Sequence, residues 1–176
     1  ALDRVGLEAT ARYLQVFKVS GEDLGMQTGP LYSPGMFRTL LLPHLKRRWQ
    51  AARAYLDKVN PAVRIMLHSC GSIRPFIPDL IEAGIDILNP VQISAADMDL
   101  VELKREFGQD LVFWGGGVDT QRVLGTASPQ EIRDHVRANI EALAPGGGFV
   151  FAAVHDIQAN VPPENITAMW EAWQEY

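Results

Sequence analysis

The stretch RIMLHSCGSIRPFIPDLIEAGIDIL, residues 64–88, contains two short apolar runs separated by a longer segment with helical character. The runs at residues 64–67 and 85–88 are predicted to be strands, since each is short, mostly apolar and bounded by turn-forming residues. The segment from Ile73 to just before Gly84 is predicted to be a helix that the glycine ends. This order of strand, helix and strand is typical of a unit of a parallel sheet.

The same alternation continues in both directions along the chain. Further strands are predicted at residues 16–20, 111–114 and 149–154, which gives five βα units whose strands are nearly all apolar, as in sheets buried on both faces. A long helix is predicted from Ser33-Pro34 to about Val59, with a kink at Pro43. The other helices are predicted at residues 2–14, at 98–107, from Ser128-Pro129 to about 143, and from Pro162-Pro163 to the C-terminus.

Five βα units suit either an open doubly wound sheet or the later part of an eight-unit barrel. A complete barrel typically needs about 250 residues, and this chain has 176. No low-complexity linker divides the chain, so residues 1–176 are predicted to form a single domain that is too short to close a barrel alone. The chain begins with Ala1 rather than with Met, which suggests a processed or truncated product.

Composition and charge argue against several classes of protein. The formal net charge of −5 provides no basic surface of the kind that binds nucleic acid. No apolar run approaches the roughly 20 residues that span a bilayer, and the N-terminus lacks the pattern of a signal peptide. The only cysteine, Cys70, cannot form an internal disulfide, which fits a reducing compartment. We therefore expect a cytoplasmic protein with no nucleic-acid or membrane partner.

Polar and glycine residues follow every predicted strand at the same end, where parallel α/β folds gather their chemistry. His68 and Cys70 are two residues apart in extended chain, so their side chains project to the same side. Imidazole nitrogen and thiolate sulfur are zinc ligands, and a catalytic zinc site uses three protein ligands. His155 follows the fifth strand and is the natural third ligand. The alternative is that Cys70 is a small buried residue and His68 a hydrogen-bonded histidine.

Other strand-end residues permit two interpretations. Asp23 and Asp119 are candidates for acid/base or substrate-orienting groups, although loop aspartates more often cap helices or form turns. The three glycines at 115–117 could bring backbone amides close to an anion, but they lack the spacing of the known phosphate-binding motifs, which favours a tight turn.

Four segments together resemble the uroporphyrinogen decarboxylase superfamily, and within it the zinc-dependent methyltransferases that handle corrinoid cofactors. They are GEDLGMQTGPLYSPGMF (21–37), HSCGSIRPFIPDLIEAGIDILNPVQ (68–92), FWGGGVDTQ (113–121) and PPENI (162–166). The resemblance covers essentially the whole chain. It implies a (β/α)₈ TIM barrel of the uroporphyrinogen decarboxylase type, of which this chain supplies about the last five βα units and lacks the first three.

The resemblance also implies a site. Zinc would be bound by His68, Cys70 and His155, the last standing where the methyltransferases have a cysteine. His155, Asp23 and Asp119 would be catalytic, and Asn89, Gln92 and Gly116 would bind substrate. The methyl group would move between cobalamin on a partner corrinoid protein and a thiol or a methylated small molecule.

Two other functions remain open. A uroporphyrinogen decarboxylase, which acts on tetrapyrrole acetate side chains in porphyrin biosynthesis, also carries a histidine at the position of His155 and uses no metal. A non-enzymatic half-barrel would have unpaired sheet edges, and it should pair with the missing N-terminal part or with a second copy of the chain.

Overall fold

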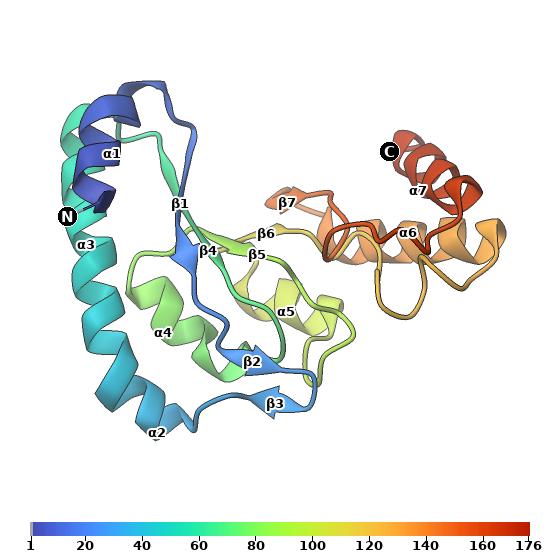
Figure 1. Ribbon diagram of the computed structural model, residues 1–176, viewed down its shortest axis with the longest axis horizontal. Coiled ribbons are helices and arrows are strands. Elements are labelled where there is room, and N and C mark those ends of the chain that lie inside the picture. The colour runs from blue at the N-terminus through green and yellow to red at the C-terminus, as the bar shows by residue number, and fades with distance from the viewer. Residues whose placement is uncertain (1) are drawn as a thin grey trace.

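The computed structural model describes residues 2–176, apart from the side chains of Leu2 and Ser20. Its centre is a five-stranded sheet with the strand order β1-β4-β5-β6-β7 (Figure 1). The strands are β1 (Val16–Gly21), β4 (Arg64–His68), β5 (Ile87–Asn89), β6 (Val112–Trp114) and β7 (Phe149–Val150). Each of these five strands pairs in parallel with the next one of the five. This is the arrangement of consecutive units in a (β/α)₈ barrel, and it confirms the predicted fold class.

Helices alternate with these strands as predicted. They are α1 (Leu2–Thr10) with the 3₁₀ turn η1 (Ala11–Tyr13), α2 (Pro34–Met36), the π-helical η2 (Phe37–Leu41), α3 (Leu42–Val59), the 3₁₀ turn η3 (Arg74–Phe76), α4 (Ile77–Glu82), α5 (Leu100–Phe107), α6 (Pro129–Leu143) and α7 (Pro163–Gln174). Ser128 begins α6 with a capping box that includes Glu131, which is why its predicted start is accurate.

The predicted helix at 33–59 is continuous in position but changes type along its length. Ser33 caps its start by accepting a hydrogen bond from the backbone N–H of Met36. The irregular turn η2 ends at Leu41, two residues before Pro43, which has no N–H to donate to the preceding turn. The irregularity predicted near Pro43 is therefore present, as one π-helical segment.

Two features of the sheet differ from the sequence prediction. A short antiparallel pair, β2 (Gly25–Met26) and β3 (Gly29–Pro30), lies between β1 and α2 and was not predicted, because two-residue strands of glycine and proline carry no strand pattern. The predicted strand at 149–154 is regular only to Val150. Beyond it the ladder continues irregularly, with Gly117 N–H donating to Ala152 C=O at 2.9 Å, because Gly115 and Gly116 opposite have positive φ.

One face of the sheet is packed under α3, α4 and α5. The residues of this core include Trp49, Leu56, Ile65, Leu67, Phe76, Ile77, Leu88, Leu103 and Phe113. The opposite face, which corresponds to the inside of a barrel, carries half-buried residues, among them Met66, His68, Asn89 and Trp114. The expectation that both faces of every strand are buried is therefore met on one face, whereas on the other Ile87 is buried and these residues are only half-buried.

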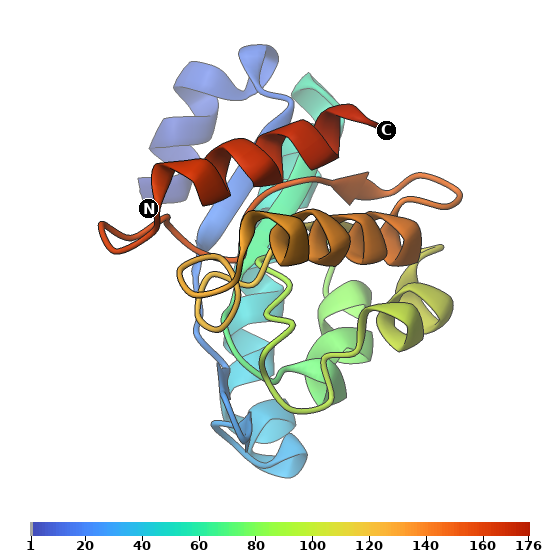
Figure 2. The same ribbon diagram turned by 90° about the vertical axis from the view of Figure 1, so that its right-hand side faces the viewer.

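A second apolar cluster joins the last two helices. It includes Val118, Leu124, Ile132, Val136, Ile140, Val161, Ala168 and Ala172, and Phe149 packs against both clusters. Figure 2 shows α7 lying alongside α6 at the end of the sheet. None of the helices within the described residues is long and apolar enough to cross a membrane.

Candidate metal centre

The loops that follow β1 and β4 meet at the carboxyl end of the sheet. A bulge in β1 shifts the register so that Gly21 pairs with His68, and the backbone N–H of Glu22 donates to His68 C=O at 2.9 Å. Gly25 and Gly71 then touch backbone to backbone. A Cβ on Gly25 would lie 2.7 Å from the backbone nitrogen of Ser72, so only glycine permits this approach. The contact places the loop carrying Asp23 against the loop carrying Cys70.

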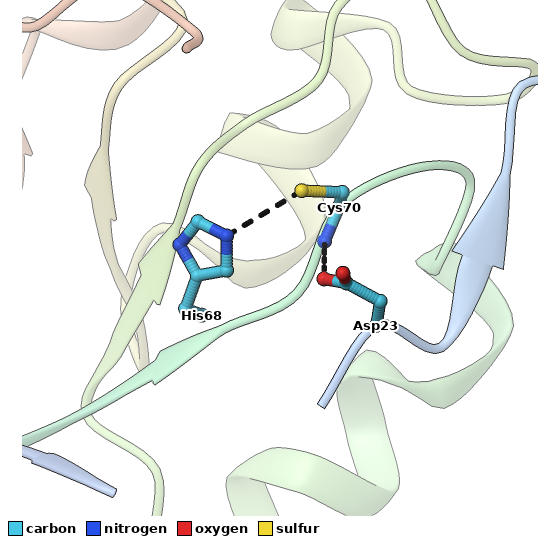
Figure 3. Close-up of side chains that lie close together, drawn as sticks. All are labelled: Asp23, His68 and Cys70. Carbon is cyan, nitrogen blue, oxygen red and sulfur yellow. Dashed lines mark hydrogen bonds between the residues drawn. The ribbon is translucent and has the colours of Figure 1, made fainter. Parts of the chain in front are cut away.

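Asp23, His68 and Cys70 form a cluster of possible metal ligands at this meeting point (Figure 3). One ligand atom from each residue lies within 4.8 Å of the other two. Cys70 Sγ is 3.5 Å from His68 Nε2, and Asp23 Oδ1 accepts a hydrogen bond from the backbone N–H of Cys70 at 3.1 Å. Tetrahedral zinc with bonds of about 2.0–2.3 Å requires nitrogen and sulfur ligands roughly 3.5 Å apart. The donor types and the Sγ to Nε2 distance therefore fit zinc.

The surroundings of Cys70 favour the protonated thiol when no cation is bound. The pKa of Cys70 is raised to about 11, first by burial and then by the negative charge and hydrogen bond of Asp23, while Lys18 lowers it. A divalent cation at the cluster would reverse this balance, since a coordinating thiol loses its proton.

Asn89 holds the ring of His68 from the side away from Cys70. Its Oδ1 lies 2.7 Å from His68 Nδ1, and its Nδ2 donates to the backbone carbonyl of Trp114 at 3.1 Å. The sequence predicted Asn89 as a substrate-binding residue. The structure places it beside the predicted ligand His68, on the wall of the same cavity.

His155 lines an open cavity of about 580 Å³ together with His68 and Asn89. It is not a member of the ligand cluster formed by the described residues. Its Nε2 lies 3.3 Å from Oε1 of the buried Gln92, which also accepts a hydrogen bond from the backbone N–H of Gly71 at 2.7 Å. Gln92 thus ties His155 to the Cys70 loop, and the role of His155 as third ligand stays a prediction.

Asp119 and Gly116 both accept hydrogen bonds from other groups of the chain. Asp119 is buried, and its Oδ1 accepts hydrogen bonds from the backbone N–H groups of Gln121 and Arg122 at 2.8 and 3.2 Å, as in the turn-forming interpretation. The backbone carbonyl of Gly116 accepts from Asn139 Nδ2 at 3.0 Å. Asp119 lines a separate cavity of about 330 Å³ with His135. The catalytic role of Asp119 and the substrate role of Gly116 stay predictions.

The place of Asp23 in the cluster with His68 and Cys70 is the main feature that sequence reasoning missed. Asp23 was predicted to be catalytic, and the chain offered one further signal, the pair of glycines at 25 and 71. Their contact joins two loops that are distant in the sequence. Beside it, Leu24 N–H donates to Ser69 Oγ at 3.1 Å, a hydrogen bond between residues 45 positions apart. The glycines permit a close backbone contact, but no local pattern shows that these two loops meet.

The fold and the cluster define a barrel-type α/β protein with a nitrogen, sulfur and oxygen ligand set at the carboxyl edge of its sheet. The chain belongs to the uroporphyrinogen decarboxylase (URO-D) family, whose sequence model matches residues 4–176. Among solved structures, a methyltransferase from Methanosarcina mazei has a similar fold, with a TM-score of 0.65 and 22% identity over 92% of this chain and 42% of that chain. The chain thus spans less than half of that methyltransferase. No curated protein gives a significant match.

Proposed function

We propose that this chain carries the zinc site of a methyltransferase that moves a methyl group between a corrinoid and a thiol or a methylated small molecule. The observation that carries the proposal is the convergence of His68 Nε2, Cys70 Sγ and the Asp23 carboxylate at the carboxyl edge of the sheet. The resemblance of the motif segments and the similar fold of a methyltransferase support the reaction class.

His68 and Cys70 would bind the ion, with Asp23 as the third ligand and His155 as the candidate predicted from the sequence. When bound, zinc would lower the pKa of a substrate thiol, so that a thiolate is present at neutral pH. The cavity of about 580 Å³ beside His68 is large enough for a small-molecule substrate. A corrinoid protein would approach the same open end of the sheet.

A uroporphyrinogen decarboxylase is the second candidate. The description of the matching family and the position of His155 outside the ligand cluster favour it. In that reaction His155 would stabilise or transfer charge on the cavity wall, and Cys70 would have no chemical role. The two candidates differ in whether the protein contains zinc.

The deciding experiment is elemental analysis of the protein purified without chelator. We expect near-stoichiometric zinc that Cys70→Ser and His68→Ala abolish, since each removes a ligand. A loss in Asp23→Asn but not in His155→Ala would identify the third ligand as Asp23, and the reverse result would identify it as His155. Asp156→Asn, on the cavity wall but outside the cluster, and the exposed His44→Ala are matched controls that should retain zinc. Zinc-free wild-type protein would favour the decarboxylase.

A further inference from the structure

The amide of Asn89 has only one orientation that its neighbours accept. A backbone carbonyl can accept but never donate, so the Asn89 atom that lies 3.1 Å from the Trp114 oxygen must be the nitrogen. With the amide reversed, two oxygens would face each other without a proton between them. The oxygen of Asn89 is therefore the atom that faces His68 Nδ1 at 2.7 Å.

This orientation decides which ring nitrogen of His68 carries the proton. Oδ1 of Asn89 has only lone pairs, so Nδ1 of His68 must donate its hydrogen to it. In a neutral imidazole the other nitrogen, Nε2, then has a free lone pair. Nε2 is the atom that lies 3.5 Å from Cys70 Sγ.

The contact is built into the sheet rather than into a loop. His68 and Asn89 are directly paired in register on the neighbouring strands β4 and β5, and Ser69 N–H donates to Asn89 C=O at 2.8 Å. The side chain of Asn89 continues to the backbone of Trp114 on β6. One amide thus joins three strands, which restricts both the position and the orientation of the imidazole.

We infer that Asn89 is a positioning residue that holds His68 in the Nδ1–H tautomer, so that the Nε2 lone pair is directed to the ion at the ligand cluster. The opposite tautomer would place an N–H bond where the ion must bind. Hydrogen bonding of the second ring nitrogen is a general way in which proteins orient a histidine ligand. This inference rests on the proposed zinc function, but the tautomer itself is a property of the metal-free protein.

The first experiment therefore needs no metal. Protein labelled with ¹⁵N in its histidine rings is stripped with chelator and examined by two-bond ¹⁵N–¹H correlation NMR at about pH 8, where an ordinary histidine is neutral. We expect a protonated Nδ1 and an unprotonated Nε2 for His68, whose signals are assigned by their loss in His68→Gln. Asn89→Leu should shift the ring toward the Nε2–H form, whereas Asn89→Asp, which loses the donor to the Trp114 carbonyl but keeps an acceptor for Nδ1, should retain Nδ1–H. Unchanged His44, His135 and His155 signals report an intact fold.

The second experiment measures zinc affinity by competition with a chromophoric chelator. We expect Asn89→Leu to weaken zinc binding by about 10–100-fold, as is typical when such a partner is lost, and Asn89→Asp to weaken it less. An Nε2–H ring in the wild type, or an unchanged tautomer and affinity in Asn89→Leu, would overturn the inference even if the protein binds zinc. If the tautomers are as expected but the protein binds no zinc, the inference about Asn89 stands and the proposed zinc function is rejected.

Discussion

Cys70 occupies a half-buried position where its thiol faces an imidazole and a carboxylate. At the scale of single residues, its chemistry depends on whether a cation is present. Without one, burial and Asp23 hold the pKa of Cys70 at about 11, so the reactive thiolate is scarce at neutral pH. The residue is therefore a weak nucleophile by itself, and a positive charge at the cluster would be needed to make its thiolate the main form.

Cys70 in the metal-free protein should react slowly with iodoacetamide at about pH 7.5, and the rate should rise as the pH approaches the pKa near 11. Asp23→Asn removes a negative charge that raises this pKa, so it should increase the rate at neutral pH. Asp156→Asn, outside the cluster, should leave the rate unchanged. A mass-spectrometric time course measures the reaction, and equal rates in the wild type and Asp23→Asn would contradict the assigned influence of Asp23.

At the scale of elements, the site depends on how closely the loops after β1 and β4 approach. Gly71 has φ of 83°, a left-handed conformation that side chains rarely adopt, and a Cβ there would lie 2.7 Å from the backbone nitrogen of Met26. Ser72 N–H donates to Met26 C=O at 2.9 Å in the same contact. The glycines therefore have a structural role that determines which side chain reaches Cys70.

Gly71→Ala should lower the free energy of unfolding by about 2 kcal/mol or more, from backbone strain and steric overlap. It should also weaken zinc binding, because the loop carrying Asp23 must move away. Gly29→Ala is the matched control, since Gly29 lies in the β2–β3 hairpin that Gly71 contacts, a Cβ on it would meet nothing within 4 Å and its φ is not positive. Chemical denaturation and chelator competition measure both effects. Similar results for the two variants would show that the close contact does not position the loop.

At the scale of the whole molecule, two apolar clusters share the sheet, and His135 of α6 helps to connect them to the loop after β6. His135 Nε2 lies 3.2 Å from the donating N–H of Asp119 and 3.1 Å from Asn139 Nδ2. Both neighbouring groups donate, so the nitrogen must remain unprotonated. Burial lowers the pKa of His135, and the charge of Asp119 partly opposes this effect.

The lowered pKa predicts that the protein loses stability in mild acid. Below the ordinary histidine pKa of about 6.5, this imidazole binds a proton in the unfolded chain, whereas in the folded protein it stays neutral until the pH is lower. The free energy of unfolding should therefore fall as the pH drops through about 6.5 toward the lower pKa of folded His135. Thermal melting between about pH 7.5 and 5.5 measures this, and His135→Gln should show a smaller decline than the wild type or the exposed His44→Gln. An equal decline in all three would exclude His135 as the cause.

Much of this arrangement could be predicted from local sequence. Ser128 and Pro129 predict the start of α6 because the cap and the fixed φ of proline act within one turn. His68 and Cys70 could be paired because extended chain repeats every two residues. The two-residue strands β2 and β3 could not be predicted, since they are too short to carry a strand pattern and β2 contacts the loop after β4, where Ser72 N–H donates to Met26 C=O.

The sequence by itself determined the order of strands and helices, the edge at which polar residues gather, and the pair of His68 and Cys70, because each depends on residues close together in the chain. The tertiary structure alone decided that Asp23 joins this pair, that Asn89 holds the His68 ring and that His155 contacts Gln92. These contacts join residues 21 to 63 positions apart. They depend on strand register, a bulge in β1 and one contact between glycines, which are properties of the packed sheet rather than of any single segment.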